Sequence, residues 1–196
     1  MAVHYERDSE HVVLVTIDRP EARNSADMEH FKLLRECWDR FRDDDTAWVA
    51  IVTGVGESFF SGADLKTYVP EITKFQREIA EQGKTEINGY RLDDGTKAVL
   101  RNYPLDKPVI AAVNGVTRGA GNNMAFAADF RIASERAEFG CNFVERGLMA
   151  EASAYYLPRL VGMAKAKEMI LLNPVYTAEE AKAHGFVTEV VADDAL

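Results

Sequence analysis

The chain has 196 residues, of which 47% are hydrophobic and 28% charged, proportions of an ordinary globular protein rather than a disordered or fibrous one. Its 23 basic and 32 acidic residues give a formal net charge of -9, which argues against nucleic-acid binding, because that function needs a basic surface. No stretch approaches the roughly 18 consecutive apolar residues of a membrane span, and the first residues lack the apolar segment of a secretory signal. We therefore expect a cytoplasmic protein with no membrane partner. Two cysteines, Cys37 and Cys141, are too few for a disulfide framework or a zinc site.

Regular hydrophobic spacing predicts three elements in the first third of the chain. Val13, Val15 and Ile17 alternate with other residues, which predicts a strand that ends before Pro20. From residue 28 to 41 the apolar residues recur at spacings of three and four, which predicts an amphipathic helix capped by Ser25 or Asp27. The near-continuous apolar run at 48–53 predicts a strand buried on both faces.

The remaining two thirds alternate between predicted strands and helices. The segment 66–106 is the least regular, with one helix expected around residues 72–79 and a second over 90–100. Further strands are expected at 108–113, 130–135, 137–140 and 186–191, and helices at 120–127, 151–157, 163–172 and 177–184. This alternation predicts an α/β fold with crossover connections. Since no repeat or linker interrupts the chain, we expect one domain over residues 1–196.

Several common catalytic motifs are missing from the sequence. The segment GVGESFFSG follows a strand, as a phosphate-binding loop would, but lacks the Gly-Lys-Ser/Thr that ends a Walker motif. There is no Gly-x-Ser-x-Gly elbow, and the four histidines lack metal-ligand spacing, so no metal site is expected.

Two loops resemble each other in composition. FFSGADLK (59–66) and NGVTRGAGNNMAFA (114–127) each follow a predicted strand and contain small residues ahead of a predicted helix. Small residues let a ligand approach backbone N–H groups, so two such loops together could form an oxyanion hole. The simpler alternative is a pair of tight strand-to-helix turns, in which glycine is the usual residue.

A series of motifs extends this pattern over nearly the whole chain, from about Val12 to Val191. In order and spacing it resembles the enoyl-CoA hydratase/isomerase (crotonase) family, through the segments IDRPEARNS, VTGVGESFFSGADLK, KPVIAAVNG, GAGNN, ADFRIASERAEFG, RGL, LPRLVGMAKAKEMILL and TAEEAKAHGFVTEVV. The resemblance implies a spiral of ββα units that binds a coenzyme A thioester. Coenzyme A would enter as part of the substrate, with no permanently bound cofactor.

Particular residues acquire expected roles from this resemblance. The oxyanion donors would be the backbone N–H groups of Ala63 and Ala120, where the family usually has glycine in place of Ala120. The remaining substrate and coenzyme A contacts would come from two groups of positions: Arg23, Asn24, Ser25 and Ala26, and Gly62, Asp64, Leu65, Lys66, Gly119 and Phe143. The residues themselves suggest a simpler role for Asp64, as a helix cap, and for Lys66, as a solvated surface residue.

The sequence departs from the family's hydratases at the positions of their two catalytic glutamates. Asn123 and Phe143 stand there, and neither can transfer a proton. Glu151 matches the single glutamate of some Δ3,Δ2-enoyl-CoA isomerases in the family, so the resemblance implies a one-base isomerase in which Asn123 hydrogen-bonds substrate or a water. The alternatives are an acidic residue that merely complements a helix N-terminus, and hydration that uses Glu145 as a displaced acid. A non-catalytic acyl-CoA-binding protein is a further alternative.

Two more departures concern the surroundings of the site. The segment 66–106 is longer than in most family members and carries Tyr68, Tyr90 and Tyr103, which suggests an altered acyl group. Members usually continue with helices that cover the acyl pocket and contact neighbouring subunits, whereas this sequence ends at Leu196. We expect exposed apolar side chains on the last helices, and a homo-oligomer, either a trimer or a dimer of trimers as in the family. Cys141 is expected to be a small core residue rather than a pocket residue.

Overall fold

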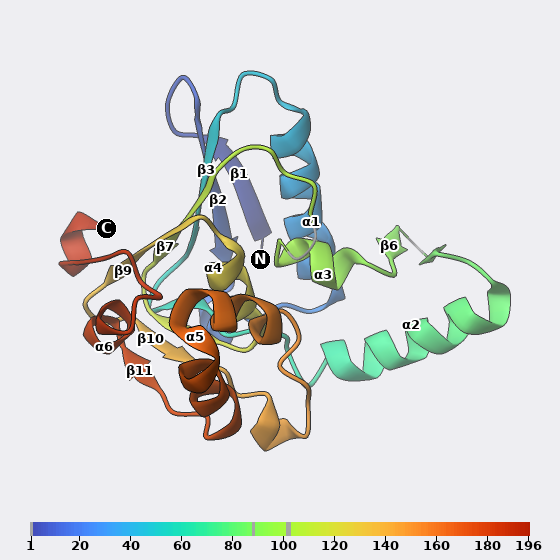
Figure 1. Ribbon diagram of the computed structural model, residues 1–196. Helices are drawn as coiled ribbons and strands as arrows, with labels where there is room; N and C mark the ends of the chain where they lie inside the picture. Colours follow the sequence, from blue (N-terminus) through green and yellow to red (C-terminus); the bar gives the residue numbers. More distant parts are fainter. Residues whose placement is uncertain (1, 88, 101–102) are drawn as a thin grey trace.

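The computed structural model describes residues 2–87, 89–100 and 103–196, and within them two parallel-rich sheets dominate (Figure 1). The larger sheet has the order β1-β2-β3-β7-β9-β12, formed by Ala2–Arg7, Val12–Asp18, Val49–Gly54, Val109–Val113, Phe130–Ser134 and Glu189–Val191. The smaller has the order β11-β10-β8-β4, formed by Tyr176–Thr177, Glu138–Gly140, Val116–Arg118 and Ser58–Phe60. Only the pairs β1–β2 and β10–β11 are antiparallel in these sheets.

The same ββα path recurs along the chain. A strand of the large sheet leads to a strand of the small sheet and then to a helix in β3–β4–α2, β7–β8–α4 and β9–β10–α5, whose helices span Tyr68–Gln82, Ala120–Ala127 and Ser153–Leu171. Because β4 and β8 are parallel neighbours, with Phe60 opposite Thr117, the loops that follow both strands leave the same edge of the small sheet. The predicted α/β spiral of ββα units is confirmed, and it brings the two small-residue loops together.

Helix α1 (Met28–Asp43) covers one face of the large sheet. Asp27 caps it by accepting from the backbone N–H of His30 at 3.0 Å, which settles the choice between the two expected caps. The apolar side chains at helical spacing are buried as predicted, and Trp38 also donates from Nε1 to the carbonyl of Ala98 at 2.9 Å. On the sheet side, Val13, Val15 and Ile17 alternate into the core. Strand β1 was not predicted, because its charged and aromatic residues conceal the alternation of Val3 and Tyr5, which pack against that core.

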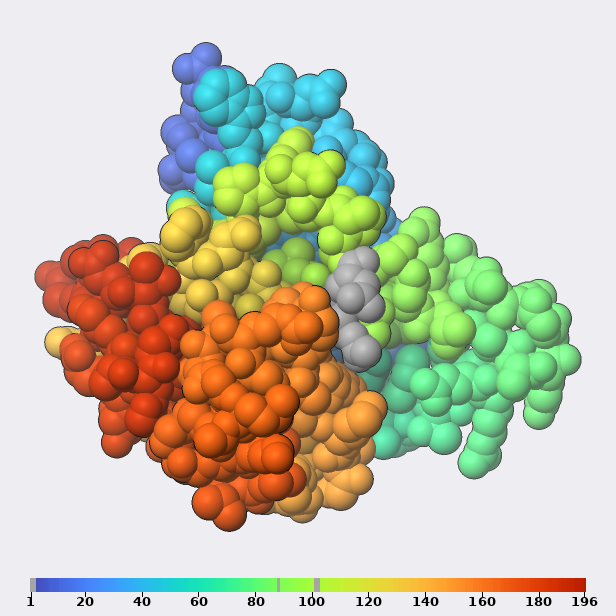
Figure 2. Space-filling view, viewed as in Figure 1, coloured from blue at the N-terminus to red at the C-terminus, as the bar shows by residue number. Residues whose placement is uncertain are grey.

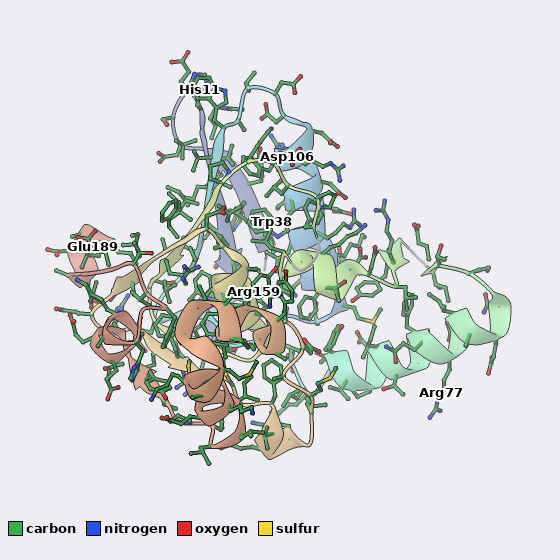
Figure 3. All side chains as sticks on the ribbon, in the orientation of Figure 1. His11, Trp38, Arg77, Asp106, Arg159 and Glu189 are labelled. Carbon is green, nitrogen blue, oxygen red and sulfur yellow. The ribbon has the colours of Figure 1, made fainter. Side chains whose placement is uncertain are left out.

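The insert at 66–106 differs from the expectation in its second half. Helix α2 is present and projects from the body of the molecule, as the green segment in Figures 1 and 2 shows. In Figure 3, Arg77 on this helix points away from the rest of the chain. The second predicted helix, over 90–100, is wrong: the chain forms a short hairpin of β5 (Glu86–Ile87) and β6 (Tyr90–Arg91), and then a single-turn α3 (Asp94–Ala98).

A buried ion pair determines where α3 lies. The Arg35 guanidinium donates from Nε to Asp94 Oδ1 at 2.8 Å, and the other carboxylate oxygen accepts from the backbone N–H of Arg91 at 2.7 Å. Both side chains are buried, so α3 is tied to α1 by charge-assisted hydrogen bonds. A periodicity argument could not find this contact, because its partners are 59 residues apart in sequence.

The C-terminal part contains two helical segments that meet at a kink, which agrees with the two helices predicted at 151–157 and 163–172. α5 spans Ser153–Leu171 and bends at Gly162, whose φ of 76° is not helical. Two 3-10 turns, η2 (Val144–Arg146) and η3 (Asp193–Ala195), and the short helix α6 (Ala178–Ala183) complete this part, with a first 3-10 turn, η1, at Pro20–Ala22. As expected, large apolar side chains on and after α5 are exposed: Tyr155, Met163, Leu171, Leu172 and Val175. In the described part of the chain, no helix combines the length and the apolar character that crossing a membrane requires.

Candidate active site

A cavity of about 670 Å³ lies where the loops after β4 and β8 meet α2, α3 and the segment that leads into α5. Polar groups in its wall include backbone groups of both loops and the carboxylate of Glu151. Apolar and aromatic side chains in its wall come from α1 and α2 and from the segments beside them. The side chains and backbone groups around it are those of Phe31, Ser61, Gly62, Ala63, Leu65, Tyr68, Val69, Ile72, Gln76, Leu92, Gly95, Thr96, Val99, Arg118, Gly119, Ala120, Asn142, Phe143, Arg146, Leu148 and Glu151. The cavity therefore combines an apolar compartment with a few polar groups, as small-molecule sites commonly do.

The first loop leaves the backbone amide of Ala63 outside its bridge to Ala26. Ala26 and Ala63 form an isolated parallel bridge, in which Ala26 donates to the carbonyl of Gly62 at 2.8 Å and accepts from Asp64 N–H at 2.7 Å. In a parallel bridge the residue between the two bonded neighbours turns its own N–H to the opposite side. The N–H of Ala63 is therefore directed away from Ala26, and Ala63 lines the cavity.

The second loop supplies another amide close to the first. Gly119, with a φ of 51°, ends β8, and α4 begins at Ala120, so the Ala120 N–H belongs to the first helical turn and has no acceptor within the helix. A Cβ placed on Gly62 would lie 3.2 Å from the Ala120 nitrogen and 3.0 Å from the Arg118 carbonyl oxygen, which shows how closely the loops approach. Ala63 and Ala120 thus line one cavity from adjacent loops, and backbone donors at such a place would suit a developing oxyanion.

Glu151 is the carboxylate that lines the cavity in the described part of the chain. It is not in the first turn of a helix, as the sequence suggested, but two residues before α5, in the left-handed region with a φ of 43°. Its neighbours Ala150 and Ala152 are both buried, so the exposed glutamate lies between two residues fixed in the core. A non-glycine residue in this conformation is uncommon and costs free energy, which makes the position noteworthy.

A buried asparagine holds the glutamate. Asn123 on α4 has no exposed surface, and its Nδ2 donates to Glu151 Oε2 at 3.1 Å. Its Oδ1 accepts two hydrogen bonds from Ser153, from the backbone N–H at 2.8 Å and from Oγ at 2.6 Å. The three residues form one hydrogen-bonded group that connects α4 to the start of α5.

Tyr68 faces the cavity from the first turn of α2. Burial raises the pKa of the Tyr68 phenol, and the carboxylate of Glu151 raises it further. The phenol is therefore protonated at neutral pH and can donate a hydrogen bond to a ligand in the cavity. Its ring lies 4.7 Å from that of Phe31, centroid to centroid, so two aromatic rings form part of this wall.

The sequence and the fold of this chain are similar to those of known proteins. A sequence model of the family described as enoyl-CoA hydratase/isomerase matches residues 7–196. The chain belongs to the enoyl-CoA hydratase/isomerase family. It is 37% identical over 190 residues to an "(E)-benzylidenesuccinyl-CoA hydratase" of Thauera aromatica, covering 96% of this chain and 69% of that protein.

A second curated relative and a solved structure agree with this assignment. The chain is 34% identical to a "1,2-epoxyphenylacetyl-CoA isomerase" of Escherichia coli, covering 94% of this chain and 68% of that protein. The crystal structure of an enoyl-CoA hydratase from Bacillus anthracis superimposes with a TM-score of 0.84 at 30% identity, over 99% of this chain and 71% of the other. Other matched relatives are covered to a smaller share, such as 64% of a mevalonyl-coenzyme A hydratase of Beauveria bassiana. The chain thus spans about two thirds of the length of its curated relatives.

Of the residues that the family resemblance implied, one group lines the cavity. Gly62, Ala63, Leu65, Gly119, Ala120, Phe143 and Glu151 all contribute to its wall. Phe143, at a position where hydratases of the family carry a glutamate, is buried there. Glu145, the displaced acid considered above, is exposed and accepts from Asn142 Nδ2 at 3.3 Å, and it is not part of the cavity wall. The roles of these cavity-lining residues in substrate binding stay predictions.

The segment at 23–26 lies outside the wall of the cavity and has a different local role. Asn24 is completely buried, with φ of 57°, and its Nδ2 donates to the carbonyls of Ser58 at 2.6 Å and Val55 at 3.0 Å, which fixes the β3–β4 turn. This arrangement is at odds with the expected contact to coenzyme A, because the side chain has no accessible atoms. Ala26 is equally buried and acts through its bridge to Ala63. Arg23 is exposed and Ser25 half-buried, so both remain accessible to a ligand outside the cavity.

Asp64, Lys66 and Asn123 also differ from the contacts expected for them. Asp64 forms an ion pair with Arg19 at 3.0 Å and accepts from the backbone N–H of Lys66 at 3.1 Å, so it stabilises the loop. Although burial opposes the effect, these partners hold the pKa of Asp64 below its usual value. Lys66 is exposed and outside the cavity wall. Asn123 is buried behind Glu151, so its amide is in contact with the carboxylate rather than with the cavity.

Sequence reasoning missed the role of Ser153 and gave Tyr68 only as one of several aromatic residues. Ser153 gave no signal, because a serine near a helix start is usually read as a cap. Cys141 is buried and not in the wall of the cavity, in agreement with the core role expected for it.

Proposed function

We propose that this protein isomerises a 3-enoyl-CoA thioester to the conjugated 2-enoyl-CoA, with Glu151 as the only base. The observation that carries the proposal is that, among the described residues, one carboxylate, that of Glu151, lines the same cavity as Ala63 and Ala120. An isomerisation adds and removes no atoms, so one group that accepts a proton and returns it is sufficient.

The reaction has two proton transfers. Glu151 removes a proton from C2, the C–H electron pair forms a C1–C2 double bond, and the thioester oxygen becomes negative. The N–H groups of Ala63 and Ala120 stabilise this oxygen, as donors directed at a developing charge do in other enzymes by roughly 3–4 kcal/mol each. The carboxylic acid of Glu151 then protonates C4, the carbonyl reforms, and the double bond moves from C3–C4 to C2–C3.

The apolar side chains in the wall of the cavity are suited to the acyl chain. Side chains such as those of Phe31, Ile72 and Val99 offer no charge to stabilise a polar substituent, while the protonated phenol of Tyr68 offers one hydrogen bond. Two of the matched relatives carry names that refer to phenyl-bearing thioesters. We therefore extend the proposal to acyl groups that bear an aromatic ring, which would pack against Phe31 and Tyr68.

Hydration is the second candidate, because hydratase names predominate among the matched relatives. Addition of water needs a group that activates the water and one that delivers a proton. Phe143 can do neither, and Asn123 is buried and hydrogen-bonded to Glu151. Losing a general acid or base usually costs about 10²–10⁴ in rate, so we expect hydration to be slow.

Isomerisation and hydration can be distinguished by the products that the protein forms from two substrates. trans-3-Hexenoyl-CoA and crotonyl-CoA are incubated with the native protein, Glu151→Gln and Glu145→Gln, and products are followed by ultraviolet absorbance and NMR. The proposal expects conjugated 2-hexenoyl-CoA from the native protein and Glu145→Gln, and none from Glu151→Gln. Fast formation of 3-hydroxybutanoyl-CoA without isomerisation would favour hydration, and thioester binding without any reaction would indicate a non-catalytic protein.

A further inference from the structure

We propose that Ser153 is a positioning residue that orients Asn123 and, through it, the carboxylate of Glu151. The inference rests on the proposed function, because it assigns Glu151 the part of the base. It concerns a residue that lies outside the cavity wall and that the reaction scheme above does not use.

The two hydrogen bonds from Ser153 determine how the amide of Asn123 is turned. The backbone N–H of Ser153 can only donate, so the atom 2.8 Å from it must be the amide oxygen. The hydroxyl of Ser153 donates to the same oxygen at 2.6 Å. With Oδ1 occupied by two donors, the NH₂ group of Asn123 is left to face Glu151.

The consequence for Glu151 is a fixed donor on its charged form. Asn123 Nδ2 lies 3.1 Å from Oε2, and a hydrogen bond to a carboxylate favours the ionised state that a base requires. If the amide rotated by half a turn, its oxygen would face the carboxylate and disfavour that state. Ser153 prevents this rotation, because the oxygen would lose both of its donors in a site without exposed surface.

The backbone around Glu151 suggests that this arrangement serves the carboxylate and not only the packing of helices. Glu151 alone among residues 150–153 has a positive φ, while Ala150, Ala152 and Ser153 are buried. A connection between α4 and α5 for stability alone would not require a strained, exposed glutamate as its third member. Together, the left-handed Glu151 and the hydrogen-bonded amide fix both ends of this side chain.

The test uses two variants, Ser153→Ala and Asn123→Asp, that change the hydrogen bonds and nearly keep the size of the side chains. Ser153→Ala removes the hydroxyl donor and leaves the backbone donor. Asn123→Asp keeps an oxygen for Ser153 but places a second oxygen, in place of the NH₂ group, against Glu151. Ser153→Thr retains the hydroxyl and should restore the native behaviour. Ser134→Ala is the matched control, because Ser134 is a buried serine on β9 whose hydroxyl bonds to Asp193.

Two quantities are measured for each variant: the pH profile of kcat/KM with trans-3-hexenoyl-CoA, and the pKa of Glu151 by ¹³C NMR of protein labelled at glutamate carboxyls. The signal of Glu151 is assigned by its loss in Glu151→Gln. In Ser153→Ala we expect the pKa of Glu151 to be higher, and the acidic limb of the kcat/KM profile to move to higher pH by the same amount. We also expect kcat to fall by up to about tenfold, with little change in KM. In Asn123→Asp both shifts should be larger, because two carboxylates share the site.

The outcomes separate this inference from the proposed function. If Ser153→Ala and Ser134→Ala have the same Glu151 pKa as the native protein, Ser153 only packs and the inference is wrong, even where Glu151→Gln abolishes isomerisation. If Glu151→Gln still isomerises, the proposed function is wrong, while the NMR titration still reports whether Ser153 acts on the carboxylate. Should Ser153→Ala not fold, Asn123→Asp with an unchanged Glu151 pKa would overturn the inference equally.

Discussion

Gly62 and Ala120 lie against each other at the point where the two loops meet. A Cβ on Gly62 would be 3.2 Å from the Ala120 nitrogen, and the φ of Gly62, 94°, lies in a region that other residues rarely adopt. The distance between the two proposed oxyanion donors therefore depends on the absence of a side chain at position 62.

Gly62→Ala should separate these donors. We expect a fall in kcat for the thioester substrate of about 10²-fold, the cost of one lost oxyanion donor, together with a small loss of stability from backbone strain. Gly83→Ala is the control, because Gly83 also has a positive φ, 64°, but ends α2 far from the loops with open space around it. Equal kcat values in the two variants would show that the approach of the loops does not matter for turnover.

The left-handed backbone of Glu151 leads to an unusual order of stabilities. Both Glu151→Gly and Glu151→Ala lose the hydrogen bond from Asn123, but only glycine adopts a φ of 43° without a steric penalty. Glu151→Gly should therefore be more stable than Glu151→Ala by about 1–2 kcal/mol, the reverse of the usual order. Urea unfolding measures the difference, and a more stable alanine variant would contradict the backbone conformation described above.

The two cysteines should be unreactive in the folded protein. Burial raises the pKa of the Cys37 and Cys141 thiols to about 12, so almost no thiolate is present at pH 8. We expect a maleimide to label neither residue in the native state and both residues in urea, as read by mass spectrometry. Rapid labelling of native Cys141 that acyl-CoA prevents would instead place this thiol in the cavity.

Stability should decline at acidic pH partly because of Asp39. Burial opposes the effect, but hydrogen bonds from Tyr103 and Arg35 hold the pKa of Asp39 below its usual value. A carboxylate with a lowered folded-state pKa stabilises the protein above its unfolded pKa, and this contribution disappears as the pH falls through the folded value. Asp39→Asn should reduce stability at pH 7 and flatten the decline that begins as the pH falls below about 4. Asp45→Asn is the matched control, because Asp45 is exposed. Urea unfolding at pH 7 and at acidic pH should show the same stability for this variant as for the native protein.

Local patterns were sufficient for the regular core but not for contacts distant in sequence. The alternation at Val13, Val15 and Ile17 and the helical spacing of α1 depend on one buried face each, so both were predicted. The segment at 90–100 was not, because its position depends on the buried pair of Arg35 and Asp94 rather than on its own periodicity.

In the candidate site, too, local patterns predicted some features and missed contacts between residues distant in sequence. The loops with Gly62 and Gly119 could be found from composition, since glycine marks the turns after β4 and β8. The hydrogen bonds that Asn123 makes to Glu151 and Ser153 span 28 and 30 residues, and no spacing rule connects them. Asn24 illustrates the opposite error, because a position suggested by resemblance is completely buried in a structural role.

Removal of the C2 proton is the step on which the whole account depends. trans-3-Hexenoyl-CoA is incubated in D₂O with native protein and Glu151→Gln, and ¹H NMR follows the C2 protons and the conjugated product. We predict that the native protein removes C2 protons and forms 2-hexenoyl-CoA, while Glu151→Gln does neither, although it still binds the thioester. Loss of C2 protons at equal rates in both proteins would contradict the assignment of Glu151 as the base.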